Sequence, residues 1–186
     1  MKYIIDLNTE RCIACGACAV ACMDQNDVYP QVGDQPLRKC VTVEDGEGME
    51  VKMTYLSLGC MHCEDAPCIR ACPLGCIRKD EETGFVVYDN SRCIGCHSCS
   101  MACPFSAPAF GADKKMRKCN GCYERIKHGM LPACVKVCPM GALSLYTEEE
   151  YEKKKTERAA RSLIRCAESL REHKQSFVRK VSPGKL

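Results

Sequence analysis

The sequence has no tryptophan, and only 6% of its 186 residues are aromatic. Large aromatic side chains supply much of the buried area of a small domain, so we expect a thin apolar core for this length. There is also no run of about 18 apolar residues, and none of the segments reads as a membrane span. The first residues, Met1 to Asp6, lack an apolar signal region. We therefore expect a cytoplasmic protein, with membrane association or export through a partner left open.

Cysteine, in contrast, is very abundant, with 19 residues. Secreted disulfide scaffolds are also rich in cysteine, but here the count is odd and the spacing is regular. Residues 93–104 read C-x2-C-x2-C-x3-C followed by proline. This is the arrangement with which bacterial ferredoxins hold cubane iron–sulfur clusters. Three thiolates bind one cluster and the fourth binds a neighbouring cluster, so such a run requires a partner run.

Three further stretches repeat this pattern. The first run lacks the final proline, because Met23 follows its fourth cysteine. The second run has two extra residues in its middle, and the fourth run has a longer loop. Together the four runs contain sixteen of the 19 cysteines. They are Cys12, Cys15, Cys18, Cys22, Cys60, Cys63, Cys68, Cys72, Cys93, Cys96, Cys99, Cys103, Cys119, Cys122, Cys134 and Cys138. Four [4Fe–4S] clusters require this number of thiolates.

Two pairings of the runs satisfy the count: one with four and two with three, or one with two and three with four. Residues 2–7 and 142–146 both predict strands, and pairing them brings runs one and four together. A predicted hairpin at 76–88 joins runs two and three. If the fourth cysteine of each run binds the cluster of its partner run, four sites result. Site A uses Cys12, Cys15, Cys18 and Cys138, and site B uses Cys119, Cys122, Cys134 and Cys22. Site C uses Cys60, Cys63, Cys68 and Cys103, and site D uses Cys93, Cys96, Cys99 and Cys72.

These elements predict an α+β fold made of two bacterial-ferredoxin-like subdomains with two clusters each. Residues 1–30 with 112–147 form the first subdomain, and residues 59–111 form the second. Residues 31–58 form a loop and a β-hairpin insertion without ligands. Residues 148–186 form an amphipathic C-terminal helix and tail.

The C-terminal helix has a defined start, because Thr147 and Glu150 fit a capping box. We expect it to reach about residue 175, with a loose tail after Phe177. Its apolar stripe, at Ala160, Leu163, Ile164, Ala167 and Leu170, favours packing along the cluster-binding body, and docking on a partner subunit is the alternative.

Other metal sites explain the runs less well. A zinc site uses separated pairs of ligands and does not call for a third cysteine or a final proline. His97 completes the C-x-x-C-H motif of c-type haem attachment, but Cys99 and Cys103 fit haem badly and the other runs lack this histidine. His62 and His97 are interpreted as solvent-edge or hydrogen-bonding residues. Cys40, Cys76 and Cys166 are interpreted as small apolar residues or free thiols.

The formal net charge of +3 counts cysteines as neutral. With sixteen thiolates and four oxidised cores, the net charge becomes about −5, which argues against nucleic-acid binding. The basic residues Lys114, Lys115, Arg117 and Lys118 form either a solvated face or a cluster that offsets this charge or meets an acidic partner.

The fourth run, Cys119 to Ala142, and the second run, Cys60 to Cys68, closely resemble the iron–sulfur electron-transfer subunits of molybdenum and tungsten pterin oxidoreductases. These are small subunits of the dimethyl sulfoxide reductase and formate dehydrogenase type, and the resemblance covers about residues 1–146. It implies that runs one and four pair, as do two and three. Some relatives have tryptophan in place of one ligand of the third run and bind a three-iron cluster. Cysteine at this position, Cys96, implies four complete cubanes.

The resemblance implies a non-catalytic subunit that relays single electrons. One partner would be a large pterin-containing subunit of a formate dehydrogenase, dimethyl sulfoxide reductase-like or aldehyde oxidoreductase-like enzyme, nearest to site A. The other would be an iron–sulfur, flavin or membrane subunit. No substrate-site residues accompany the runs, so no catalytic residue is assigned. The alternatives are a free-standing soluble polyferredoxin and a structural zinc module that binds proteins.

Overall fold

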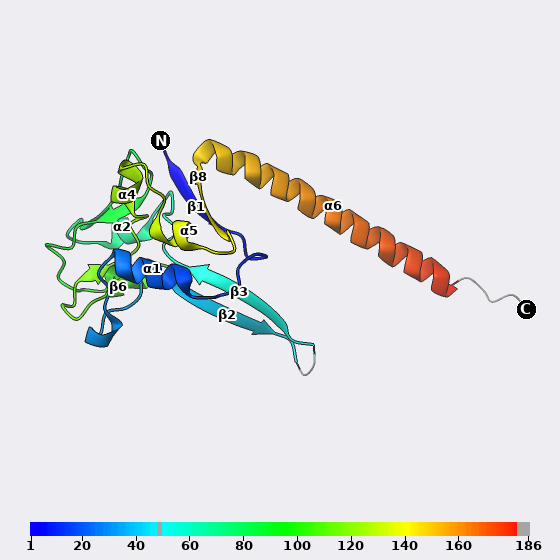
Figure 1. Ribbon diagram of the computed structural model, residues 1–186, viewed down its shortest axis with the longest axis horizontal. Coiled ribbons are helices and arrows are strands. Elements are labelled where there is room, and N and C mark those ends of the chain that lie inside the picture. Colours follow the sequence, from blue (N-terminus) through cyan, green and yellow to red (C-terminus); the bar gives the residue numbers. More distant parts are fainter. Residues whose placement is uncertain (48–49, 182–186) are drawn as a thin grey trace, which may run out of the picture. The chain divides into compact units, whose positions relative to one another are not determined.

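The computed structural model describes residues 1–47 and 50–181, with side chains through residue 171 (Figure 1). The chain divides into two compact units, Met1–Thr147 and a second unit that begins at Glu148. All sixteen predicted ligands lie in the first unit, which mixes short strands with short helices. Because Met1–Thr147 forms one unit, the subdomain boundaries inside it stay predictions.

The strands of Met1–Thr147 are arranged as four separate antiparallel pairs. They are β1 (Tyr3–Leu7) with β8 (Leu143–Thr147), β2 (Lys39–Asp45) with β3 (Lys52–Leu58), β4 (Ile77–Lys79) with β5 (Val86–Tyr88), and β6 (Ala109–Phe110) with β7 (Met116–Arg117). The predicted pairing of the two terminal strands is confirmed, with Ile5 opposite Leu145. The β2–β3 hairpin, also predicted, extends away from the short helices of Met1–Thr147 (Figure 1). The pair β6–β7 was not predicted, because two-residue strands are too short to show an alternating pattern.

Short helices contain or directly follow cysteines of the four runs. They are α1 (Ala17–Gln25), α2 (Pro67–Ala71), α3 (Ser98–Ala102), α4 (Tyr123–Lys127) and α5 (Ala133–Val137), with a 3-10 turn at Pro30–Val32. Helix α1 packs on α5, and α2 packs on α3. These contacts join run one to run four and run two to run three.

Proline explains the length of these helices. Cys72, Cys103 and Cys138 each follow the last residue of a helix, and a proline comes next in the chain. Proline disfavours helical backbone at the residue before it, so these helices end after five residues. In run one, Met23 stands in place of the proline. Helix α1 does not end at this point and reaches Gln25, with a total length of nine residues.

The apolar interior described for Met1–Thr147 consists of several small clusters. Among the described side chains, seven of the 20 buried apolar residues are cysteines and four are alanines. Phe85 is fully buried and packs with Val87 and Ile126, against which Ile5 and Leu145 of the terminal strands also lie. The core is thus thin, as the scarcity of aromatic residues predicted.

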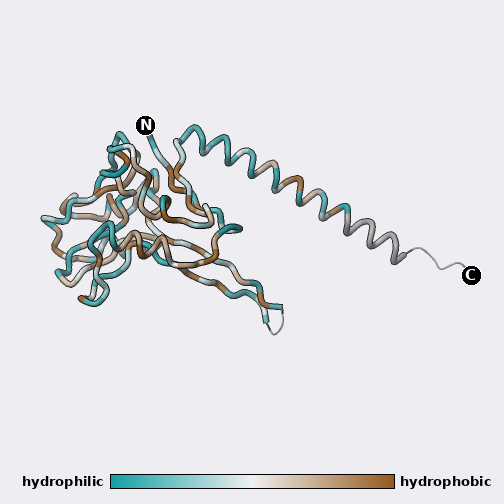
Figure 2. Tube along the Cα trace, in the orientation of Figure 1, coloured by the Kyte–Doolittle hydropathy of each residue, from teal (hydrophilic) through white to brown (hydrophobic). Residues whose placement is uncertain are grey.

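The second unit consists of helix α6 (Glu148–Val181), which is 34 residues long. It extends beyond the predicted end near residue 175, and residues 178–181, predicted as loose, are helical. The rest of the predicted tail lies outside the described residues. Its first turns are strongly hydrophilic (Figure 2), and the stripe residues Leu163 and Leu170 are 71% and 69% exposed. Within the described residues, no helix combines the length and the apolar character needed to cross a membrane.

Candidate metal centres

Three hollows in Met1–Thr147 are lined by cysteines from two different runs. Each contains about 330–340 Å³ of space free of protein atoms, part of it open to solvent. The first is lined by Cys12, Cys15, Cys18 and Cys138, the second by Cys60, Cys63, Cys68 and Cys103, and the third by Cys72, Cys93, Cys96 and Cys99. The structure therefore brings together the cysteines assigned to sites A, C and D.

The cysteines assigned to site B lie close together in a more deeply buried place. Cys22, Cys119 and Cys134 are all buried. Burial, followed by the nearby thiolates of Cys119 and Cys134, raises the pKa of Cys22 to about 12. Burial likewise raises the pKa of Cys134 to about 11, with Cys119 and Cys122 adding to the effect and Arg38 opposing it. The four thiols assigned to site B are thus near enough to influence one another.

One backbone feature recurs in all four runs. The residue directly before the second cysteine always has a positive φ, at Ala14 (φ 51°), His62 (φ 48°), Gly95 (φ 67°) and Gly121 (φ 72°). This left-handed conformation curls the loop between the first two cysteines and is costly for residues with a Cβ. Sequence reasoning missed the feature, because glycine occupies the position in only two runs.

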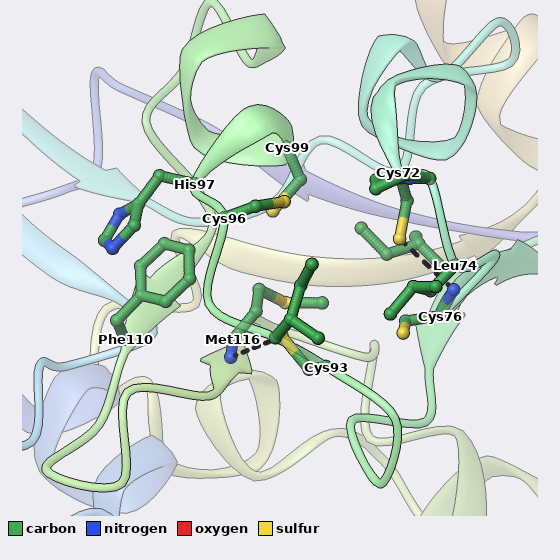
Figure 3. A pocket seen from close by; sticks show the side chains of 12 residues that line it. Cys72, Leu74, Cys76, Cys93, Cys96, His97, Cys99, Phe110 and Met116 are labelled. Atoms are coloured by element: carbon green, nitrogen blue, oxygen red, sulfur yellow. Dashed lines mark hydrogen bonds between the residues drawn. The ribbon is translucent and has the colours of Figure 1, made fainter.

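Backbone amides donate hydrogen bonds to several of the sulfurs. The N–H of Cys76 donates to Cys72 Sγ at 3.2 Å, and that of Met116 donates to Cys93 Sγ at 3.3 Å (Figure 3). The N–H of Ala142 donates to Cys138 Sγ at 3.2 Å in the same way. Such bonds stabilise thiolate sulfur and, in iron–sulfur proteins, tune the reduction potential.

These amides act against the effect of burial. Burial opposes ionisation of Cys72, but the amides of Cys76, Leu74 and Gly75 lower its pKa below the ordinary value. At more enclosed positions burial prevails and raises the pKa of Cys60 and of Cys99 to about 11. Thiols with such a pKa keep their protons at neutral pH unless a metal takes the place of the proton.

The hollow at site D shows how the remaining side chains are used. Figure 3 shows Cys72, Cys93, Cys96 and Cys99 around it, with apolar contributions from Leu74 and Met116. His97 stacks on Phe110, with ring centroids 3.8 Å apart. The aromatic contact gives His97 a packing role at the edge of the site.

Two cysteines outside the predicted sets lie at these sites. Cys76 lines the hollow of site D and is buried. Cys40 lines the hollow of site A, where its sulfur is 3.7 Å from Cys18 Sγ. Cys166 is exposed on α6, and none of the 19 cysteines forms a disulfide. This agrees with the interpretation of Cys40, Cys76 and Cys166 as small apolar residues or free thiols, but the sequence did not place Cys40 and Cys76 beside the ligands.

The basic run before the fourth cysteine run does not form one solvated face. Lys114 is exposed, whereas Lys118 is completely buried. Arg117 forms an ion pair with Asp34, at 3.3 Å. Of the two interpretations left open for this run, the solvated face does not apply to Lys118, because its ammonium group lies inside the fold among backbone carbonyls.

The donor set fits iron–sulfur clusters. The cysteines of each hollow are the soft thiolate ligands that such clusters and zinc prefer. Among the described residues, no group of three or more His, Cys, Asp or Glu side chains is arranged to hold a single metal ion.

Comparison with known proteins assigns the sequence to a family. Residues 51–148 match the model of a 4Fe-4S dicluster domain, and residues 9–24 match a 4Fe-4S binding domain. The B subunit of the anaerobic dimethyl sulfoxide reductase of Escherichia coli (strain K12) is 39% identical over 168 residues, which cover 86% of this chain and 80% of that protein.

Two further relatives have other enzymatic contexts. The thiosulfate reductase electron transfer subunit of Salmonella typhi is 38% identical, covering 81% of this chain and 79% of that protein. The iron-sulfur subunit of the nitrate-inducible formate dehydrogenase of Escherichia coli (strain K12) is 37% identical, covering 79% of this chain and 54% of that protein. All three relatives are named as parts of larger enzymes, and two names specify an iron–sulfur or electron-transfer role.

This chain therefore belongs to the family of non-catalytic 4Fe–4S electron-transfer subunits that includes those of dimethyl sulfoxide reductase, formate dehydrogenase and thiosulfate reductase.

Proposed function

We propose that the protein holds four [4Fe–4S] clusters at sites A to D and relays single electrons through them. One partner is a catalytic subunit with a molybdenum or tungsten pterin, and the other is a second redox protein. The observation that carries the proposal is that cysteines from two runs line each of three similar hollows. The fourth set is gathered in the buried region around Cys22.

The positions of the ligands support a linear order of sites from A to D. Helix α1 carries Cys18 of site A and Cys22 of site B. Cys60 of site C is near Cys119 of site B, since that thiolate adds to the effect of burial on the pKa of Cys60. Helix α2 carries Cys68 of site C, and Cys72 of site D follows it directly. Consecutive sites thus share one short element or one close contact.

When bound, each cluster supplies a centre that accepts and releases one electron. The chain fixes the cluster through its thiolates and directs amide N–H groups at the sulfurs, as at Cys72 and Cys138. Apolar residues such as Leu74 and Met116 line the hollow of site D. Exposure and hydrogen bonding are the features through which a protein adjusts cluster potentials.

The helix contacts also support the predicted division of the cluster-binding body. Packing of α1 on α5 favours residues 1–30 with 112–147 as the part that holds sites A and B. Packing of α2 on α3 favours residues 59–111 as the part that holds sites C and D. The pterin-containing subunit would then approach the end marked by site A.

Iron and sulfide analysis of anaerobically purified protein tests the number of clusters. We expect about sixteen iron and sixteen sulfide per chain, the content of four cubanes. One cluster or none, with stoichiometric zinc, would overturn the proposal.

Purification from native cells tests the role as a subunit. We expect a stable stoichiometric complex with a large pterin-containing protein. A monomer that carries four clusters and exchanges between several enzymes would instead identify a free-standing polyferredoxin.

A further inference from the structure

Two cationic side chains are buried inside Met1–Thr147. Lys118 is 0% exposed and Arg38 is 4% exposed. Among the ion pairs of the described side chains, neither cation is joined to a carboxylate. A buried charge is costly unless an opposite charge compensates it. We therefore asked which negative groups lie beside these two cations.

Lys118 lies where sites B and C meet. Its Nζ donates to the carbonyl oxygens of Val86 and Cys119, the latter at 2.9 Å, and lies 3.8 Å from Cys60 Sγ. Cys119 is assigned to site B and Cys60 to site C. The two carbonyls are neutral, so they solvate the ammonium group without balancing its charge.

His62 adds a second link at the same junction. Its Nδ1 accepts a hydrogen bond from the N–H of Val86 at 3.0 Å. In a neutral imidazole the proton is then on Nε2, which lies 3.6 Å from Cys119 Sγ. A residue between two ligands of site C thus contacts a ligand of site B.

Arg38 lies where sites A and B meet. Its Nη1 donates to the carbonyl and hydroxyl oxygens of Ser57, at 3.1 and 3.0 Å. The same hydroxyl is 3.1 Å from Cys18 Sγ of site A. On the other side, the thiolates of Cys134 and Cys119 of site B raise the pKa of Arg38 against the effect of burial. Its Nε is buried without a hydrogen-bond partner.

We propose that Lys118 and Arg38 are fixed counter-ions for the reduced clusters, placed at the B–C and A–B junctions. The inference rests on the proposed function, because it requires clusters at these sites. When one electron passes between neighbouring clusters, the donor cluster is oxidised and the acceptor cluster is reduced. The acceptor thereby gains one negative charge. No bond forms or breaks in this step.

The effect on potential follows from charge and burial. A cation in a low-dielectric interior stabilises the reduced form of an adjacent cluster and so raises its potential. It also weakens repulsion when two neighbouring clusters are both reduced. Site B lies beside both cations, whereas the lining of the site D hollow contains no lysine or arginine. The cations therefore favour electrons on the inner sites.

Redox titration of the full-length holoprotein, followed by electron paramagnetic resonance, tests the proposal. Lys118→Met removes the buried charge, Lys118→Arg retains it, and Lys114→Met removes an exposed charge of the same basic run. We expect Lys118→Met to lower the reduced-to-oxidised ratio of two cluster signals at a fixed potential about tenfold, equal to a fall of about 59 mV in each midpoint. Lys118→Arg and Lys114→Met should leave all midpoints near those of the unaltered protein.

The Arg38 variants extend the test to the other junction. Arg38→Gln should also lower two midpoints, one of them shared with Lys118→Met, and Arg38→Lys should restore them. If Lys118→Met fails to assemble its clusters, the Arg38 pair carries the test alone. Unchanged midpoints, or an equal shift of all four, would overturn the inference.

Iron content is measured first on every preparation. If the unaltered protein lacks four clusters, the proposed function itself fails. If it has four clusters and the charge-removing variants leave their midpoints unchanged, only the counter-ion role fails.

Discussion

The residue before the second cysteine of each run determines how its ligand loop curls. At Gly121 the backbone has φ 72°, and an added Cβ would overlap the ring of Phe85. We expect Gly121→Ala to lower the thermal midpoint strongly and to reduce iron bound at site B, because neither the loop nor the buried ring can move freely. Circular dichroism and iron analysis under anaerobic conditions measure both effects.

Gly129 provides a matched control in the loop of the same run. Its φ is 70°, but a Cβ there meets open space. Gly129→Ala should cost only the backbone strain of about 1–2 kcal/mol. If Gly121→Ala and Gly129→Ala lowered the thermal midpoint and the iron content equally, the overlap with Phe85 would not explain the effect at Gly121.

A single ligand substitution tests the assignment of cysteines to sites. We expect Cys15→Ser to remove the cluster signal of site A and to leave sites C and D intact, because Cys15 lines only the hollow of site A among those described. Electron paramagnetic resonance of the reduced protein reports each site. Cys166→Ser, which alters an exposed thiol on α6, should change no signal. Joint damage to site A and a site of run two would refute the pairing of the runs.

Spacing alone identified the four cysteine runs, because such runs are local patterns in the chain, but it left open which runs pair. It could not distinguish Lys118 from Lys114, since both belong to one basic run and their burial depends on contacts with Val86 and Cys119. It also could not place Cys40 beside Cys18, because that contact depends on how the β2–β3 hairpin folds back.

At the scale of elements, the strand pair β1–β8 holds runs one and four together. Leu143, at the start of β8, is 4% exposed and packs with Cys18 and Cys134, assigned to sites A and B. We expect Leu143→Ala to destabilise the holoprotein by about 2–5 kcal/mol, the usual cost of truncating a buried leucine. Sites A and B should lose their clusters first in denaturant, as measured by their separate paramagnetic signals.

The ligand-free hairpin β2–β3 supplies the comparison. Val43 is 45% exposed near its far end, so Val43→Ala should have little effect on any cluster. If Leu143→Ala released all four clusters together, the two halves of the body would be a single cooperative unit.

Elements with their own sequence signal were predicted well. The alternating residues of β1 and β8 and the turn residues of two hairpins gave the correct pairings. The end of α6 was predicted too early, because its last turns lack a glycine or proline before Ser182–Pro183 and carry no other stop signal. The four five-residue helices α2, α3, α4 and α5 were not predicted, since five residues are too few for a helical period.

At the scale of the whole molecule, the sites themselves take the place of a large core. The described apolar interior is split into small clusters in which cysteine and alanine are prominent. Deprotonated ligands also concentrate negative charge where the sites meet, and Lys118 and Arg38 are buried at those places. Bonds from thiolate to iron must therefore contribute much of the folding free energy.

This reasoning predicts the outcome of iron removal. Treatment of the anaerobic holoprotein with a chelator should abolish protection from hydrogen exchange throughout Met1–Thr147, including the β1–β8 pair, because the cysteine thiolates that line the sites lose their metal partners. Restoring iron and sulfide under reducing conditions should restore protection. Retention of strong protection in β1 and β8 by the iron-free protein would show that the small apolar clusters around Phe85 and Leu143 are stable without the sites. The folding free energy would then have to come from packing and backbone hydrogen bonds instead.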